Sequence, residues 1–301
     1  AGIYDLLNGT NTQSELFPNY TVPKIIKEWP AHGDVSQGQD YYLAPFYDYN
    51  NDGTYNWQDG DFPWYDIKKT KDCSTERKIS LYGDLNYWWV MNDKGNIHTE
   101  TGADPIGMEI RAQAFAFASN DEVNNMTFYN YELINRGTQT LYNTYFGFFT
   151  DGALGDPYDD YVGCDVNRGL GYYYNGDNYD GDNSGFKGYG YSPPAVGVDF
   201  FEGPYQDNDG VDNPLTTDVS SAKNLGGIPY QGLGIGYGDG VIDNERFGMR
   251  RFLYYSNTGG GANINQTDPV NASDYYHYLR GNWKDGTPFY YGGSGHYSSP
   301  G

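Results

Sequence analysis

The run of oxygen-bearing side chains at residues 48–59 constrains this chain more than any other feature. A twelve-residue calcium loop supplies ligands from positions 1, 3, 5, 7, 9 and 12, and it turns sharply at a glycine in position 6. Gly53 stands at that sixth position. The ligand positions are filled, in order, by Asp48, Asn50, Asp52, the Thr54 carbonyl, Asn56 and Asp59. The spacing therefore predicts a calcium loop of the EF-hand or dockerin type.

Two features set this loop apart from an EF-hand. Asp59 replaces the glutamate that usually binds the ion through both carboxylate oxygens at position 12. The flanking residues show no helical pattern, whereas dockerin-like loops use the shorter aspartate and do not always need a second helix. The alternative interpretation is a solvated acidic turn.

The chain is strongly acidic, with a formal net charge of -22 and a pI near 4.2 over 301 residues. An acidic surface repels nucleic acids and anionic membranes, so neither is expected as a partner. No run approaches the roughly 18 apolar residues that a membrane helix requires, so we expect no transmembrane segment. Bound calcium would relieve the self-repulsion of so many carboxylates.

Alternating apolar and polar residues predict an all-β fold. Residues 87–90 and 107–119 have strand periodicity, and Met108, Ile110 and Ala112 alternate with charged and polar neighbours. Residues 125–135 and 139–150 are predicted to form a hairpin around a turn at 136–138. In this hairpin Tyr129, Tyr131 and Leu133 would share one face of the first strand, and Tyr142, Phe146 and Phe148 one face of the second. Phe115, Phe117, Phe128 and Phe149 would suit an opposing layer. We expect an antiparallel β-sandwich with long Asp-, Asn- and Gly-rich metal-binding loops.

The domain organisation follows from composition. Residues 1–40 contain Pro18, Pro23 and Pro30 and are expected to form an extended arm more readily than a helix. Residues 41–301 are expected to form one β-rich calcium-binding module, with a possible subdivision near residue 151. No signal peptide opens the chain, so we expect a mature chain or a piece of a longer protein. Cys73 and Cys164 permit one disulfide in an oxidising compartment, with two separate thiols as the alternative.

A second acidic constellation is split between two segments. The first half carries Asp207, Asp209 and Asp212, and the second half carries Asp239, Asp243 and Glu245. Carboxylates from separated segments can share one ion, and its binding would close the loop between them. The alternative is a pair of independent acidic turns.

A third crowd of carboxylates surrounds residues 161–164. Asp159, Asp160 and Asp165 are the metal ligands expected there, with Asp151 and Asp156 nearby. Such a density of like charge is repulsive without a cation. Residues 175–182 have a similar composition and are interpreted as a solvated loop.

Signatures of enzymes are weak. The run at 292–296 lacks the last glycine of a nucleophile elbow, and the glycines at 232–240 lack the βαβ context of a dinucleotide site. The histidines show no zinc spacing. A glycosidase pair hidden among the glutamates stays open as an alternative, because its geometry is made in space. The glutamates concerned are Glu109, Glu122, Glu132, Glu202 and Glu245. Aromatic loops that could stack on sugars contain Trp57, Trp64, Tyr65, Trp88, Trp89 and residues 172–174, although such rings are more often buried.

Five segments resemble one group of proteins. They are residues 29–33, 38–46, 60–64, 159–165 and 239–247. These segments are similar to those of large, poorly characterised surface proteins of the Bacteroidota, which are exported by the type IX secretion system and usually end in a sorting domain. The similarity covers most of residues 30–255, but the chain shows no recognisable sorting domain.

The resemblance implies export across the outer membrane, a place on the cell surface or in the medium, and calcium-carrying β modules. It implies no reaction. We therefore expect a non-enzymatic, calcium-stabilised module of a secreted or cell-surface protein with an adhesion, surface-structural or filament role. Calcium is the expected cofactor, and the expected partners are cell-surface or secretion-system proteins, glycans or further copies of the chain. The alternative is a glycan-binding or polysaccharide-hydrolysing surface protein.

Overall fold

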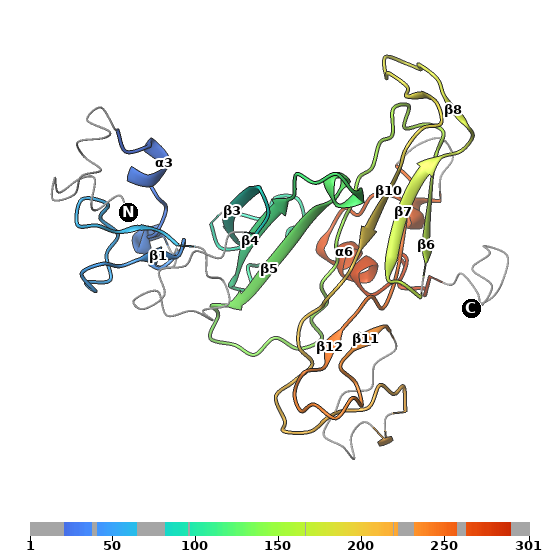
Figure 1. Ribbon diagram of the computed structural model, residues 1–301. Helices are drawn as coiled ribbons and strands as arrows, with labels where there is room; N and C mark the ends of the chain where they lie inside the picture. Colours follow the sequence, from blue (N-terminus) through green and yellow to red (C-terminus); the bar gives the residue numbers. More distant parts are fainter. Residues whose placement is uncertain are drawn as a thin grey trace. The chain divides into compact units, whose positions relative to one another are not determined.

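The computed structural model describes residues 21–37, 41–64, 82–95, 97–165, 167–218, 220–221, 232–257 and 263–289 (Figure 1). Contacts divide the chain into two units, Ala1–Tyr142 and Asn143–Gly301, and each is described by itself. Cys73, Tyr65 and the run at 292–296 lie outside the described residues. Cys164 has no disulfide partner among the described residues.

The all-β prediction is confirmed, because strand residues outnumber helical ones in the described part of the chain and every strand ladder there is antiparallel. Unit 1 contains α3 (Lys24–Lys27), β1 (Phe46–Tyr47), β2 (Phe62–Pro63), β3 (Leu85–Asn92), β4 (Met108–Ala116) and β5 (Thr127–Asn135). Short 3-10 turns lie at Val35–Gln37 and Glu122–Asn125. The sheet order is β3-β4-β5, with β1 and β2 forming a separate pair.

Unit 2 is built from shorter strands. They are β6 (Asp160–Asp165), β7 (Leu170–Asn175), β8 (Tyr179–Asp180), β9 (Gly190–Tyr191), β10 (Ala195–Asp199), β11 (Gly234–Ile235) and β12 (Arg246–Phe247). A 3-10 turn at Ile264–Gln266 and the helix α6 (Ala272–Leu279) follow. The strands form a three-stranded sheet of order β10-β7-β6 and the pairs β8-β9 and β11-β12.

The extended arm expected for residues 1–40 stays a prediction, and its described part, residues 21–37, contains one helical turn. Pro23 has a φ of -56° and precedes the single helical turn α3, because the fixed φ of proline suits a helix start. Trp29 and Ala31 are buried against Ala44. The indole N–H of Trp29 donates to the Pro45 carbonyl over 3.0 Å, so this segment packs into unit 1.

The second strand of the predicted hairpin is not formed. Residues 139–150 contain no strand, and β5 pairs instead with β4 along its whole length, from Thr127 opposite Ala116 to Asn135 opposite Met108. The unit boundary after Tyr142 falls inside the segment that was expected to return. Tyr142 is 83% exposed, so its aromatic ring contributes little burial to a hairpin.

Aromatic residues pair within one sheet rather than across two. Phe115 lies opposite Phe128, and their rings stack at 5.2 Å between centroids. Phe117 packs edge-on against both rings, whereas Phe149 stacks with Tyr255 in unit 2. The two facing layers of a sandwich stay a prediction, since the larger sheets belong to different units.

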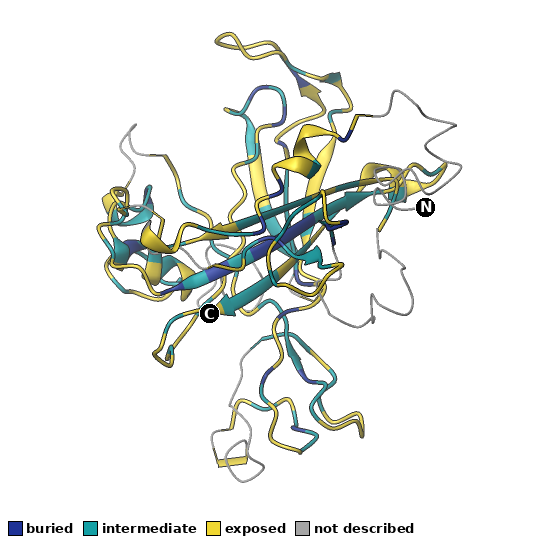
Figure 2. Ribbon diagram, turned by 90° about the vertical axis from the view of Figure 1, so that its left-hand side faces the viewer, coloured by how far each residue is buried: buried dark blue, intermediate teal, exposed yellow. Residues whose placement is uncertain are grey.

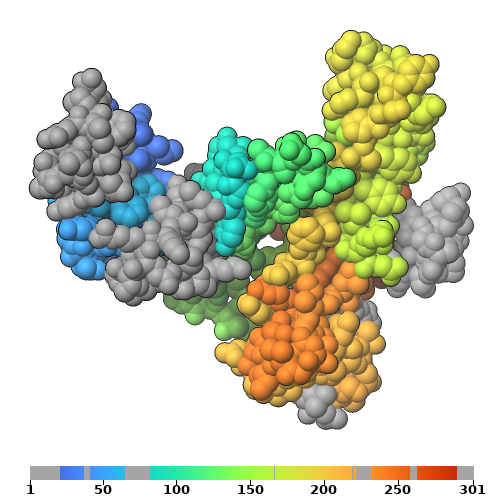
Figure 3. All heavy atoms as spheres, viewed as in Figure 1, coloured from blue at the N-terminus to red at the C-terminus, as the bar shows by residue number. Residues whose placement is uncertain are grey.

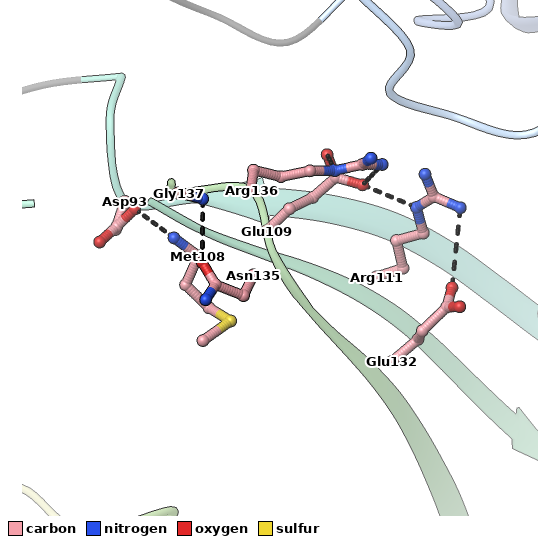
Figure 4. A network of polar contacts seen from close by, with 8 residues as sticks. All are labelled: Asp93, Met108, Glu109, Arg111, Glu132, Asn135, Arg136 and Gly137. Atoms are coloured by element: carbon pink, nitrogen blue, oxygen red, sulfur yellow. Dashed lines mark hydrogen bonds and ion pairs between the residues drawn. The ribbon is translucent and has the colours of Figure 1, made fainter. Parts of the chain in front are cut away.

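The polar face of β4 is buried, as the dark run along one strand in Figure 2 shows. Glu109 is 1% exposed, and its carboxylate accepts hydrogen bonds from Arg111 Nε over 2.8 Å and from Arg136 Nε over 3.2 Å (Figure 4). Glu132 lies 3.6 Å from the Arg111 guanidinium. In unit 1, therefore, a buried carboxylate is neutralised by arginines.

We expect Glu109→Gln to lower the free energy of unfolding of unit 1 by about 3 kcal/mol, because two guanidinium groups lose their charged acceptor. Five of the six tryptophans lie in unit 1, so tryptophan fluorescence during urea unfolding reports this unit. Glu28→Gln is the control, because Glu28 pairs with Lys24 at the surface and such pairs contribute little. Equal losses in the two variants would contradict the account.

Candidate calcium sites

The loop at residues 48–59 is closed by a short β-ladder. Phe46 lies opposite Pro63 and Tyr47 opposite Phe62, so β1 and β2 bring the two ends of the loop together. The rings of Tyr47 and Phe62 stack at 4.8 Å between centroids. The loop is therefore held by strands, in keeping with the absence of flanking helical patterns in the sequence.

Carboxylate and amide oxygens in this loop accept hydrogen bonds from its own backbone. Asp48 accepts from the N–H of Gly53 over 2.7 Å and from that of Asp52 over 3.2 Å. Asp52 accepts from the N–H of Thr54 over 2.7 Å. Gly53 has a φ of 76°, a region that glycine adopts without steric cost. In the first half of the loop, the backbone N–H groups therefore point inward and donate to the side chains of Asp48, Asn50 and Asp52.

The end of the loop is arranged differently. Asn56 donates its side-chain N–H to the Asp59 carboxylate over 2.7 Å, and Asp59 is exposed. The residue that ties this end to the beginning is Asp61, which the spacing argument did not select. Its two carboxylate oxygens accept from the N–H of Tyr49 over 2.9 Å and from that of Asn56 over 2.7 Å.

Asp61 is fully buried, and burial raises the pKa of its carboxyl, with smaller contributions from the charges of Asp48 and Asp52. Its hydrogen bonds to the backbone act in the opposite direction on the pKa. The sequence signal that could have pointed to Asp61 is its place directly before the apolar start of β2. The buried Asp61 carboxylate thus links the beginning and the end of the loop through hydrogen bonds to Tyr49 and Asn56.

We expect Asp61→Ala to lower the free energy of unfolding of calcium-free protein by about 1–3 kcal/mol, because two backbone N–H groups lose their acceptor. Removal of the charge relieves some repulsion but leaves those donors unpaired. Urea unfolding in chelator measures the change. Asp59→Ala at the exposed end of the same loop is the control and should leave stability nearly unchanged; the opposite order of effects would remove Asp61 from this role.

The structure brings the two halves of the second constellation together. Asp243 Oδ1 accepts from the N–H groups of Asp209 and Gly210, each over 2.9 Å. The backbone N–H of Gln206 donates to the Glu245 carbonyl over 2.9 Å. Tyr205 and Arg246 form an isolated antiparallel bridge beside β12. Figure 3 shows the two segments packed against each other in gold and orange.

Four of the six acidic residues predicted at this place interact electrostatically. Burial raises the pKa of Asp207, and the charges of Asp209, Glu245 and Asp243 raise it further, whereas a hydrogen bond from Gln206 lowers it. The three charges that raise the pKa of Asp207 are all negative, like that of Asp207 itself. Such a group is unfavourable without a cation.

Glu245 is the most informative member of this group. It is 1% exposed, and its Oε1 accepts from the backbone N–H of Asn213, while Oε2 has no hydrogen-bond partner among the described residues. Asp207 Oδ1 likewise has none in that part of the chain. A buried acceptor without a donor costs about 1–3 kcal/mol, so both oxygens favour a ligand that supplies positive charge.

The other two predicted members cap turns. Asp212 accepts from the N–H of Gly238 over 2.8 Å and from that of Gly240 over 2.7 Å. Asp239 is exposed and accepts from the side chain of Asn244 over 3.0 Å, a bond that lowers the pKa of Asp239. The structure therefore separates this set into four gathered carboxylates and two turn caps.

The third predicted set is divided by the strand that carries it. Asp160 is the first residue of β6 and Asp165 the last, and Asp159 lies directly before the strand. Five residues of strand span about 16 Å, and Asp165 pairs with Arg168 over 2.8 Å. The structure thus places Asp165 apart from the other two residues.

Within the described part of the chain, no group of three or more His, Cys, Asp or Glu side chains is arranged as a metal site. Bound calcium would therefore require side chains to rotate toward a common point. Aspartate and asparagine have short side chains with few rotatable bonds, so the backbone already limits where their oxygens can go.

Several aromatic side chains considered for sugar stacking are interior. Trp64 is 5% exposed, and Trp88 packs on Trp29 at 5.3 Å between ring centroids. Tyr161 and Tyr174 stack on each other on neighbouring strands and are 60% and 41% exposed. Exposed aromatic pairs therefore occur in unit 2, and unit 1 has one as well in Tyr129 and Tyr131, which stack at 6.4 Å between centroids.

Comparison of the chain with family models, curated proteins and solved structures gives no significant match. Among the described residues, the structure has no helix long and apolar enough to cross a lipid bilayer. The functional argument therefore depends on the residues themselves.

Proposed function

We propose that this chain is a non-enzymatic, calcium-stabilised β module of a secreted or cell-surface protein. Calcium would bind at the loop of residues 48–59 and at the group formed by Asp207, Asp209, Asp243 and Glu245. The observation that carries the proposal is the buried Glu245 carboxylate, whose Oε2 lacks a donor among the described residues while like charges surround it.

Calcium suits these groups chemically. It takes six to eight oxygen ligands in flexible geometry at about 2.3–2.6 Å, and both groups supply carboxylates with backbone carbonyls and amide oxygens close by in sequence. Side chains that now accept backbone N–H groups keep further lone pairs for a cation. The ion would replace mutual repulsion with attraction.

The second group explains how calcium would stabilise the fold. Asp209 and Asp243 are separated by 34 residues in sequence, so an ion shared between their segments closes a long loop. A ligand that binds only the folded state at 100 times its dissociation constant adds about 2.7 kcal/mol. The ladder β11-β12 next to Glu245 has only two residue pairs, so a bound ion would stabilise this part of the fold most.

Calcium at millimolar concentration should raise the melting temperature of the chelated protein by about 5–10 °C, the shift expected for a gain of this size. Differential scanning calorimetry with and without chelator measures it. A melting temperature that does not respond to calcium would overturn the proposal.

The variant Glu245→Gln tests whether Glu245 binds the calcium ion of the second group. Glutamine keeps the shape and the acceptor for the Asn213 N–H, but replaces the charged oxygen with an amide, so equilibrium dialysis should find one calcium fewer per chain. Glu202→Gln in the same unit is the control, because the Glu202 side chain is 59% exposed. Asp52→Ala should remove the ion of the first loop independently. An unchanged count in both Glu245→Gln and Asp52→Ala would contradict the assignment.

The location and cellular role are proposed from the residues that resemble type IX cargo and from calcium chemistry. Weak oxygen sites fill at the millimolar calcium concentrations of extracellular modules. An adhesion, surface-structural or filament role fits a chain that carries metal-tied loops, with surface proteins, secretion components or further copies as partners. Fractionation of cells that produce the protein tests the location.

Glycan binding is a second candidate, favoured by the exposed aromatic pairs of unit 2. Tyr179 and Tyr191 contact at 4.8 Å between centroids and are 48% and 80% exposed, in addition to Tyr161 and Tyr174. Tyr191 is the most exposed ring of these pairs, so a sugar ring that stacks here would contact Tyr191. A glycan array should show signals that Tyr191→Ala lowers and Tyr142→Ala, an exposed tyrosine outside these pairs, leaves unchanged; an array without signals would eliminate this candidate.

A further inference from the structure

The start of β6, the end of β7 and the beginning of β8 lie together in unit 2. Asp160 and Asn175 are directly opposite each other in the β6-β7 ladder, so their side chains project from the same face. The N–H of Gly176 donates to the Asp159 carbonyl over 2.8 Å and continues this pairing. The strand β8 follows β7 beyond this end of the sheet (Figure 1).

Buried carboxylates from two further segments join this end. Asp180 is 1% exposed, and its Oδ1 accepts from the N–H of Asp156 over 3.1 Å, while its Oδ2 accepts from the N–H of Tyr189 over 2.7 Å. Asp156 is 5% exposed and accepts from the side chain of Asn183 over 2.8 Å. Two buried negative charges are thereby fixed beside Asp159 and Asp160.

Asn175 supplies an independent observation that points to a ligand. Its side chain is 6% exposed, and its Oδ1 has no hydrogen-bond partner in the described part of the chain, although its Nδ2 donates to the Asp177 carbonyl. Its position opposite Asp160 places these two side chains on one face of the sheet. Asp159 Oδ1 and Asp160 Oδ1 are also buried, with no partner within the described residues. Three buried acceptor oxygens at this end of the sheet therefore have no donor among the described residues.

We propose that a calcium ion binds at the end of the β6-β7 pair, ligated by Asp159, Asp160 and Asn175, with Asp156 and Asp180 adding negative charge. The choice of calcium rests on the proposed function, whereas the place rests on the three unpaired oxygens. Asp180 and Asn175 were not expected as site residues from sequence, and Asp165 is not part of this site.

The surrounding electrostatics support a cation. Burial raises the pKa of Asp159, and the charges of Asp156, Asp180 and Asp160 raise it further. A neutral water molecule could donate to two of the unpaired oxygens, but it would leave the repulsion between the carboxylates in place. Magnesium demands a near-ideal octahedron at about 2.0–2.1 Å, whereas calcium tolerates ligands that belong to separate segments.

Glycine positions show that this end of the sheet is tightly built. Gly155 has a φ of 64°, and a side-chain carbon there would lie 1.9 Å from Asp180 Oδ2. A carbon on Gly188 would lie 2.3 Å from the Asp180 carbonyl oxygen. Gly155 therefore leaves room for the Asp180 carboxylate, and Gly188 lets two backbone segments approach closely beside it.

The test counts calcium bound to the full chain by equilibrium dialysis at millimolar free calcium. Asp159→Asn and Asp160→Asn should each bind one ion fewer than the unmodified chain, because each removes a charged ligand and preserves shape. Asp165→Asn is the matched control on the same strand and should keep the full count. Near-ultraviolet circular dichroism of the tyrosines confirms folding, and if one aspartate variant fails to fold, the other decides.

Two outcomes would overturn the inference. One is a full count in a folded Asp159→Asn or Asp160→Asn variant. The other is a count for the unmodified chain that equals the ions lost in Asp52→Ala and Glu245→Gln together, which would mean that water satisfies the oxygens. Either result leaves the two proposed sites standing if Asp52→Ala and Glu245→Gln each still lose an ion, so the two failures are distinguishable.

Discussion

The need to stabilise buried carboxylates governs this fold, because its apolar interior is small. Among the described residues, seven apolar side chains are buried, against twelve that are polar or charged. An ion removed from water costs several kcal/mol unless opposite charge and hydrogen bonds compensate. The strands and turns are therefore stable only where each buried acidic group has donors or a cation beside it.

The two units meet this need in different ways. In unit 1, Glu109 is held by the guanidinium groups of Arg111 and Arg136, and Asp61 by two backbone N–H groups. In unit 2, Asp180 and Asp243 also bind backbone N–H groups, but Glu245 and Asp159 each retain a buried oxygen without a donor among the described residues. Unit 2 thus carries the stronger physical argument for bound cations.

Acidic groups in both units lie directly beside very short ladders. Asp61 precedes β2 and Glu245 precedes β12, and the ladder of each strand has two residue pairs. A ladder of two residue pairs has too few hydrogen bonds to fix its own ends against chain entropy. Strand pairing brings the acidic segments together, and a shared cation would hold the strands in register, so the two interactions would reinforce each other.

The sequence by itself determined the all-β class, the face shared by Tyr129, Tyr131 and Leu133, and the split acidic segments around 207–212 and 239–245, because strand periodicity and Asp-Asn-Gly spacing are local properties. It also pointed to the loop at 48–59. It missed the pairing of β5 with β4 in place of residues 139–150, since several strands of similar pattern compete for one edge.

Only the tertiary structure decided which carboxylates gather. Asp212 and Asp239 cap turns, and Asp165 lies at the other end of β6 from Asp160. Asp61, Asn175 and Asp180 are buried, although spacing had not selected them. Spacing along the chain gives residue types but not the direction of a side chain on a strand or the segment that lies opposite it. Strand register fixes both, and register is set by long-range pairing that no local pattern contains.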